Sequence, residues 1–172
     1  GGLGKTTLAK LLYNDHEVKE NFEIRRWSHV SKDLDVVAVT KTLLESVTSE
    51  KTTATDLNKL QVQLQQSLSN KKFLLVLDDI WYGRYVGWNS LSDIFNVRGM
   101  GSKIIITTRD ERVALPLQNF LSIHHLRSLE TEESWSLLAR HAFVERNYQQ
   151  HPSLEKIGRE IAKKCGGLPF AL

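Results

Sequence analysis

Short apolar segments alternate along this chain with segments in which apolar residues recur every three or four positions. Residues 73–77 are apolar throughout, and residues 103–108 are rich in β-branched side chains. Both segments are too short to be helices and are typical of parallel strands buried on both faces. A further strand is predicted at 26–30. Because strands and helices alternate, the sequence predicts an α/β fold, a parallel sheet with helices on both faces.

The helical periodicity predicts what covers this sheet. Leu8, Ala9, Leu11 and Leu12 share one face of a helix that starts near Lys5 and ends at about residue 14 or 15. Further helices are predicted at 36–47, at 57–68 with Thr55 or Asp56 as the N-cap, and at 88–97 after a loop that contains glycine and aromatic residues.

After about residue 125 the pattern becomes wholly helical. One apolar stripe runs from Trp135 to Phe143 with two glutamates in its first turn, and a second runs from Leu154 to Cys165 and is closed by Gly166. The sequence therefore predicts two parts. Residues 1–125 form an α/β subdomain, and residues 126–172 form the start of a small all-α subdomain.

Composition narrows the class of protein. Of the 172 residues, 41% are hydrophobic, which favours a folded core over disorder. The 23 basic and 20 acidic residues leave a net charge of +3 without a concentrated basic segment, so nucleic-acid binding is not favoured. No apolar stretch approaches the roughly 20 residues of a membrane-spanning helix. The single cysteine, Cys165, suits a reducing compartment such as the cytosol, and the spacing of the six histidines does not favour a histidine metal site.

The first seven residues have the chemistry of a phosphate-binding loop. Their sequence, Gly-Gly-Leu-Gly-Lys-Thr-Thr, matches the last part of the pattern Gly-x-x-x-x-Gly-Lys-[Ser/Thr]. Glycines let backbone N–H groups converge on phosphate oxygens, and the helix that follows adds the positive end of its dipole. Lys5 is expected to reach the β- and γ-phosphates, Thr6 to ligate Mg²⁺, and Thr7 to lie near the α-phosphate. The predicted nucleotide-binding residues here are Gly1, Gly2, Gly4, Lys5, Thr6 and Thr7.

Two carboxylates follow the apolar segment 73–77. Asp78 is expected to lie close to the Mg²⁺ held by Thr6, because oxygen ligands suit a hard cation. Asp79 is expected to orient or deprotonate an attacking water if hydrolysis occurs. Alternatively, Asp79 caps the next turn or accepts a hydrogen bond from a neighbouring group. The carboxylates and the amphipathic helix together favour a phosphate site over a surface turn with an exposed lysine.

Arg109 ends the strand predicted at 103–108. Side chains at the carboxyl ends of parallel strands line the crevice in which ligands bind, so Arg109 is expected to contact the γ-phosphate. The alternative is a surface arginine paired with Asp110 or Glu111. All four tryptophans are interpreted as packing residues.

Taken in order, these motifs resemble the NB-ARC domain of plant disease-resistance proteins. The similar segments are 1–7, 26–31, 75–81, 101–109 and 165–172, and residues 126–143 are similar to the start of the helical ARC1 subdomain. The motif that ends at Trp81 resembles that of the coiled-coil subgroup, since the TIR subgroup usually has Asp at this position. In the family, the proline of a Gly-Leu-Pro motif packs near the adenine and ribose, which adds Pro169 to the predicted site. Phe170 departs conservatively from the family pattern.

The resemblance implies a P-loop ATPase of the STAND class that acts as a switch. An ADP-bound form is off, an ATP-bound form signals defence, and slow hydrolysis, with Asp79 and Arg109 as the catalytic residues, resets the off state. The implied cofactors are ADP or ATP and Mg²⁺, in the cytoplasm. The implied partners are coiled-coil, ARC2 and leucine-rich-repeat regions outside this chain, with oligomerisation on activation. One alternative stays open, a turnover ATPase or small-molecule kinase. A degenerate ATPase that serves as a scaffold is disfavoured, because the chain has Lys5, Thr6, Asp78 and Arg109.

The chain starts within the glycine-rich loop and without Met, so it is interpreted as a piece of a longer protein that lacks the strand before the loop. That strand is expected in the middle of the sheet. Its absence is expected to leave an unpaired edge on the strand at 73–77, poor solubility and weak ADP binding.

Overall fold

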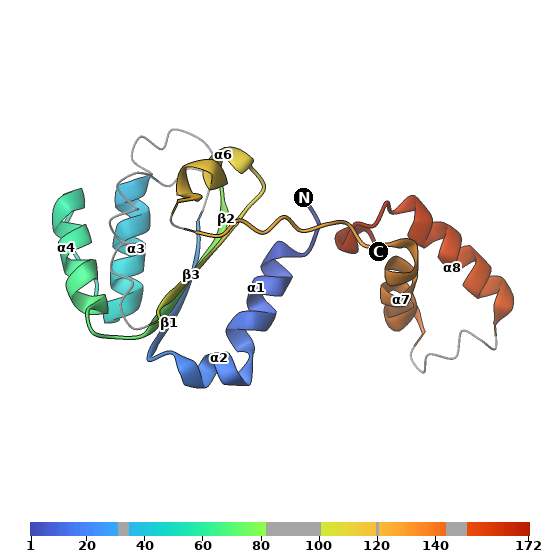
Figure 1. Ribbon diagram of the computed structural model, residues 1–172, viewed down its shortest axis with the longest axis horizontal. Coiled ribbons are helices and arrows are strands. Elements are labelled where there is room, and N and C mark those ends of the chain that lie inside the picture. Colours follow the sequence, from blue (N-terminus) through green and yellow to red (C-terminus); the bar gives the residue numbers. More distant parts are fainter. Residues whose placement is uncertain (31–34, 82–100, 120, 144–150) are drawn as a thin grey trace. The chain divides into compact units, whose positions relative to one another are not determined.

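The computed structural model describes residues 1–30, 35–81, 101–119, 121–143 and 151–172. They form two compact units, which we treat separately: Thr6–Ile123, and Gly1–Lys5 together with His124–Leu172. Figure 1 labels the elements along the chain. The helix predicted at 88–97 lies outside the described residues. No helix within the described ranges is both long and apolar enough to cross a bilayer.

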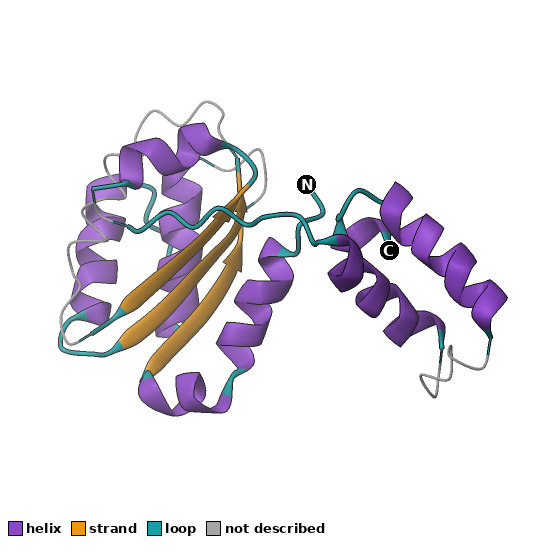
Figure 2. Ribbon diagram, turned by 45° about the vertical axis from the view of Figure 1, so that its right-hand side comes forward, coloured by secondary structure: helices purple, strands orange, loops and turns teal. Residues whose placement is uncertain are grey.

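The α/β unit is built on three parallel strands in the order β1-β2-β3, which lie side by side in Figure 2. The strands are β1 (Ile24–His29), β2 (Phe73–Ile80) and β3 (Lys103–Thr108). This arrangement confirms the predicted parallel sheet. β1 starts two residues before the predicted strand, because the buried Ile24 opens its register with Phe73. β2 extends through both aspartates, which were predicted to follow it.

The expectation that residues 73–77 would carry an unpaired edge is wrong. β2 is the central strand and pairs with β1 on one side and β3 on the other. Among the described residues, the outer edges of the sheet belong to β1 and β3. An apolar sequence predicts that both faces of a strand are covered, but it does not predict which strands pair with its edges.

Helices cover both faces of this sheet, as predicted. Within the described ranges, the helices of this unit are α1 (Lys5–Asn14), α2 (His16–Asn21), α3 (Val36–Thr48), α4 (Leu57–Leu68), α6 (Glu111–Ala114) and the short 3₁₀ helix η1 (Leu115–Leu117). Apolar residues of α3 and α4 pack against Phe73, Leu75 and Leu77. Asp56 is the cap of α4, since its carboxylate accepts a hydrogen bond from the Lys59 N–H at 2.8 Å.

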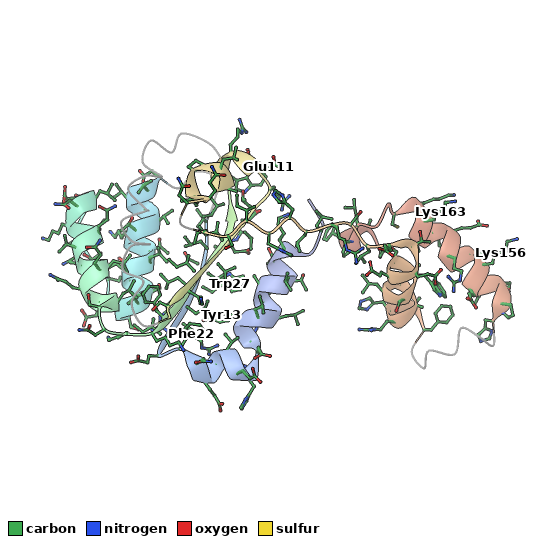
Figure 3. All side chains as sticks on the ribbon, viewed as in Figure 1. Tyr13, Phe22, Trp27, Glu111, Lys156 and Lys163 are labelled. Carbon is green, nitrogen blue, oxygen red and sulfur yellow. The ribbon has the colours of Figure 1, made fainter. Side chains whose placement is uncertain are left out.

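On the opposite face, α1 packs through a narrower surface than its sequence predicts. Ala9 is buried against Leu74 and Val76, whereas Leu8, Leu11 and Leu12 are 41%, 66% and 46% exposed. Further along α1, the ring of Tyr13 meets the ring of Trp27 edge to face, with 5.5 Å between the ring centroids (Figure 3). A small residue at the contact lets the helix lie close to the sheet. Thr6, one turn before Ala9, therefore reaches the carboxyl end of β2.

Among its described residues, the second unit contains two helices, α7 (Thr131–Ala142) and α8 (Pro152–Lys164), and the 3₁₀ helix η3 (Pro169–Ala171). Trp135 fills its core with Ala139 and Ala162. A Cβ atom on Gly158 would lie 2.4 Å from the Trp135 ring, so glycine lets α8 approach α7. The predicted apolar stripe of α8 is exposed at Leu154, Ile157 and Ile161, and Ala162 alone of that helix is buried.

Candidate functional site

The carboxyl end of β2 contains a β-bulge at the two aspartates. Leu77 is in register with Ile106 and Ile80 with Thr108, so three steps along β2 face two along β3. Asp79 has a φ of 59°, a left-handed conformation that aspartate tolerates better than most residues. The two neighbouring carboxylates consequently have different surroundings. Asp78 is buried, whereas Asp79 is partly exposed.

Asp78 lies on the face of β2 that α1 covers, two residues beyond Val76. Its Oδ1 accepts a hydrogen bond from the Thr6 hydroxyl at 2.8 Å and another from the Thr107 hydroxyl at 2.6 Å. The structure thus brings together the two residues that were predicted to hold a metal ion. A threonine hydroxyl beside a carboxylate is a hard oxygen donor set, which suits Mg²⁺.

Thr107 and His29 also lie next to the Asp78 carboxylate. Neither residue was predicted to belong to the site. The buried Thr107 hydroxyl also accepts the Asp79 N–H at 2.9 Å, so it holds the bulge as well as the carboxylate. His29 is opposite Asp78 in the β1–β2 register, with Nδ1 3.7 Å from Asp78 Oδ2. Period-two alternation along the three strands predicts that both residues share a face of the sheet with Asp78, but it does not predict which residues are opposite one another.

Arg109 pairs with the other carboxylate. Its Nε donates to Asp79 Oδ1 at 3.1 Å, and its guanidinium lies over the Trp81 ring, 5.3 Å from the centroid. Asp110, the alternative partner, is instead held by Arg112 at 2.6 Å, and hydrogen bonds from Arg112 lower the pKa of Asp110. Trp81 therefore contacts a predicted site residue, which its interpretation as a packing residue missed.

Two glycines of the predicted phosphate-binding loop have left-handed backbone conformations, which favour glycine. Gly2 and Gly4 have φ values of 81° and 85°, and Lys5 is the first residue of α1. Thr7 follows in the first turn, with its side chain exposed, and Gly1 is exposed at the start of the loop.

Pro169 belongs to the same unit as this glycine loop. It begins η3, and the next residue, Phe170, donates its backbone N–H to the Gly2 carbonyl at 3.2 Å. The remaining predicted site residues are in the α/β unit: Thr6, Thr7, Asp78, Asp79 and Arg109.

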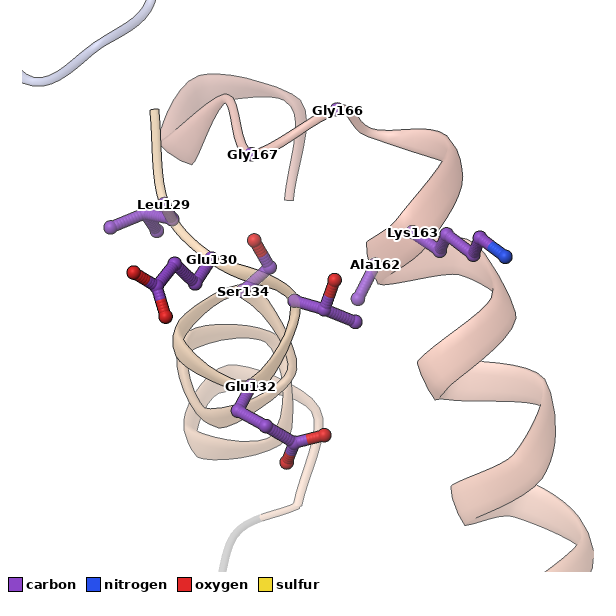
Figure 4. A pocket seen from close by; sticks show the side chains of 9 residues that line it. Leu129, Glu130, Glu132, Ser134, Ala162, Lys163, Gly166 and Gly167 are labelled. Atoms are coloured by element: carbon purple, nitrogen blue, oxygen red, sulfur yellow. The ribbon is translucent and has the colours of Figure 1, made fainter. Parts of the chain in front are cut away.

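The helical unit also contains a hollow of about 480 Å³ between the first turn of α7 and the Gly166–Gly167 loop (Figure 4). Ser134 lines this hollow, and its buried hydroxyl has no hydrogen-bond partner. None of the predicted site residues lines it. We assign it no function.

Replacing Thr107 with valine is expected to weaken the site and the fold together. The change removes one hydroxyl that donates to Asp78 and accepts from the Asp79 N–H, leaving both groups without that partner. The free energy of unfolding, measured by urea titration, should fall by about 1–3 kcal/mol. Thr107→Ser, which keeps the hydroxyl, is the matched control and should lose less than the valine variant. A loss in Thr107→Ser with none in Thr107→Val would assign the effect to the γ-methyl group, which valine keeps, and not to the hydroxyl.

Comparison with known proteins points to one family. The NB-ARC domain family matches residues 1–148. The chain is 40% identical to RPP13-like protein 1, a disease resistance protein of Arabidopsis thaliana, over 100% of this chain and 16% of that protein. It is also 40% identical to disease resistance protein RPP13 of Arabidopsis thaliana, covering 100% of this chain and 21% of that protein. With disease resistance protein RGA2 of Solanum bulbocastanum it shares 38% identity over 99% of this chain and 18% of that protein.

Proposed function

The chain belongs to the NB-ARC domain family, and from that premise we propose that it is the ADP- and ATP-binding switch module of a plant disease-resistance protein. In this proposal residues 1–125 bind the nucleotide and residues 126–172 begin the ARC1 subdomain. Slow ATP hydrolysis returns the module to an ADP-bound off state in the cytoplasm. The chain spans about a fifth or less of the relatives named above. Signalling by the whole protein is therefore part of the proposal.

The contact between Thr6 and Asp78 is the observation that carries the proposal. These residues are 72 positions apart, yet their side chains meet at 2.8 Å, and Thr107 fixes the same carboxylate oxygen. Thr6 and Asp78 would hold Mg²⁺, which would neutralise phosphate charge when bound. Within the described ranges no three His, Cys, Asp or Glu side chains form a metal-holding group. Phosphate oxygens and water would supply further ligands, as expected for a metal–nucleotide complex.

In this proposal, Arg109 is the residue that distinguishes ATP from ADP. Its guanidinium is paired with one carboxylate, Asp79, and is about half exposed, so a γ-phosphate can compete for it with more charge and more acceptor oxygens. Arg109 would then have different partners with ATP and with ADP, which is the local two-state contact that a switch requires. The same exchange would release Asp79 to interact with water.

The nucleotide retained by the protein tests this proposal. We expect full-length protein purified in Mg²⁺ to carry ADP, identified by chromatography after denaturation, and to bind a fluorescent ADP analogue competitively with ADP. Hydrolysis of added ATP should stall near one turnover because ADP is retained. Sustained multiple turnover would favour a turnover ATPase or kinase, and absence of nucleotide binding would contradict the proposal.

Replacing Asp79 with asparagine should slow hydrolysis while leaving ADP binding intact. Asparagine also tolerates the left-handed φ of 59° at this position, so the bulge is retained. A general base contributes 100-fold or more in fast enzymes, and for a slow switch we expect a loss of about ten-fold in the single-turnover rate. The ATP-bound fraction should rise. Asp110→Asn, a change at a carboxylate held by Arg112, is the control, and a parent-like rate in Asp79→Asn would leave Asp79 as only a partner of Arg109.

A further inference from the structure

We propose that His29 is a nitrogen ligand of the metal ion at this site, so that the nucleotide is bound more tightly with Mn²⁺ than with Mg²⁺. The inference rests on the proposed nucleotide function and adds a residue and a metal preference to it. It starts from the position of His29 beside Asp78, at the carboxyl end of the adjacent strand.

The carboxylate of Asp78 is held in one orientation. Both hydroxyl donors, from Thr6 and Thr107, bind Oδ1, and Oδ2 faces the imidazole of His29. The backbone is also fixed here, because the Val30 N–H donates to the Asp78 carbonyl at 3.0 Å. His29 and Asp78 therefore present one nitrogen and one oxygen to the same space from two rigid strands.

The distance between His29 Nδ1 and Asp78 Oδ2 is close to that between two ligands of one metal ion. Ligands about 2.1 Å from a metal and at right angles to each other are about 3.0 Å apart. Nδ1 of His29 is 3.7 Å from Oδ2 of Asp78, too far for a hydrogen bond, and needs to approach by about 0.7 Å. The His29 side chain is 62% exposed, whereas that of Asp78 is 6% exposed. The histidine can make this movement by a small change in its side-chain torsions.

The chemistry of the two donors sets the metal preference. Thr6 and Asp78 offer oxygen atoms, which Mg²⁺ and Mn²⁺ both accept. An imidazole adds a nitrogen ligand, and first-row transition metals bind nitrogen more readily than Mg²⁺ does. His29 should therefore strengthen binding of the Mn²⁺ complex and leave that of the Mg²⁺ complex nearly unchanged.

Pulsed electron paramagnetic resonance of the Mn²⁺–ADP complex tests the ligand directly. We expect a nitrogen coupling of the size given by a directly bound imidazole. Uniform ¹⁵N labelling of the protein should change this coupling, whereas a coupling from the adenine ring of unlabelled ADP would be unaffected. Because this measurement uses the unaltered protein, it does not depend on a variant that folds.

Replacing His29 with valine tests the metal preference. The variant should lose the nitrogen coupling and bind Mn²⁺–ADP about ten-fold more weakly, while its affinity for Mg²⁺–ADP changes less than two-fold. His16→Val, at an exposed histidine of α2, is the control and should keep the parent affinities. ADP binding with no protein nitrogen coupling, or an unchanged ratio of the two affinities in His29→Val, would overturn this inference alone. Failure of ADP to bind with either metal would overturn the proposed function as well.

Discussion

Replacing Lys5 with alanine is expected to abolish nucleotide binding at cellular concentrations and, under the proposed function, signalling by the intact protein. Lys5 is the first residue of α1 and directly follows Gly4, whose left-handed φ of 85° shapes the loop. An ammonium group at the N-terminus of a helix adds a full charge to the partial positive charge of the helix dipole. A charge-assisted hydrogen bond contributes about 1.5–3 kcal/mol, so its loss weakens binding by more than ten-fold.

Isothermal titration with ADP in Mg²⁺ measures this effect. Lys10→Ala is the matched control, because it removes the same charge from an exposed position of the same helix. The control should keep the parent affinity. Unchanged affinity in Lys5→Ala would show that the glycine-rich segment is not the phosphate-binding loop. Equal weakening by both variants would instead point to a general effect of net charge.

The sequence predicted the two helices that pack on Phe73, Leu75 and Leu77 better than it predicted α1 and α8. Residues 57–68 became α4 with the predicted bounds, and residues 36–47 became α3, which ends one residue later at Thr48, because their periodic leucines and valines face a large core. In α1 and α8, helical periodicity predicted an apolar face, but most of the apolar side chains on that face are exposed. A periodic stripe shows that a helix has an apolar face, but it does not show which part of that face the described residues cover.

Within the site, motif residues could be predicted and their neighbours could not. Thr6 and Asp78 belong to motifs whose chemistry is readable from residue type and spacing. The positions of Thr107 and His29 beside Asp78 depend on the register between strands that are far apart in the sequence. Thr107, for example, is 29 residues from Asp78, and no local pattern sets that register. The bulge at Asp79 is likewise a product of pairing with β3.

The glycine pair 166–167 shows a similar limit. Gly166 was predicted to close α8, and both glycines are left-handed, with φ values of 61° and 72°. Their surroundings differ, which the sequence does not show. A Cβ on Gly166 would meet nothing within 4 Å, whereas a Cβ on Gly167 would lie 2.3 Å from the Leu129 carbonyl oxygen. Gly167 also accepts the Leu129 N–H at 2.8 Å, next to the first turn of α7.

Replacing Gly167 with alanine is therefore expected to destabilise the helical unit by about 2–3 kcal/mol. A left-handed alanine costs about 1–2 kcal/mol, and moving the Leu129 backbone away costs about 1 kcal/mol more through the lost hydrogen bond alone. Gly166→Ala carries only the first cost, so it is the matched control. Hydrogen exchange of α7 amides, followed by mass spectrometry, measures the opening free energy of this unit separately from the α/β unit. Equal losses in the two variants would show that backbone conformation alone requires glycine at both positions, and that the contact with Leu129 relaxes without cost.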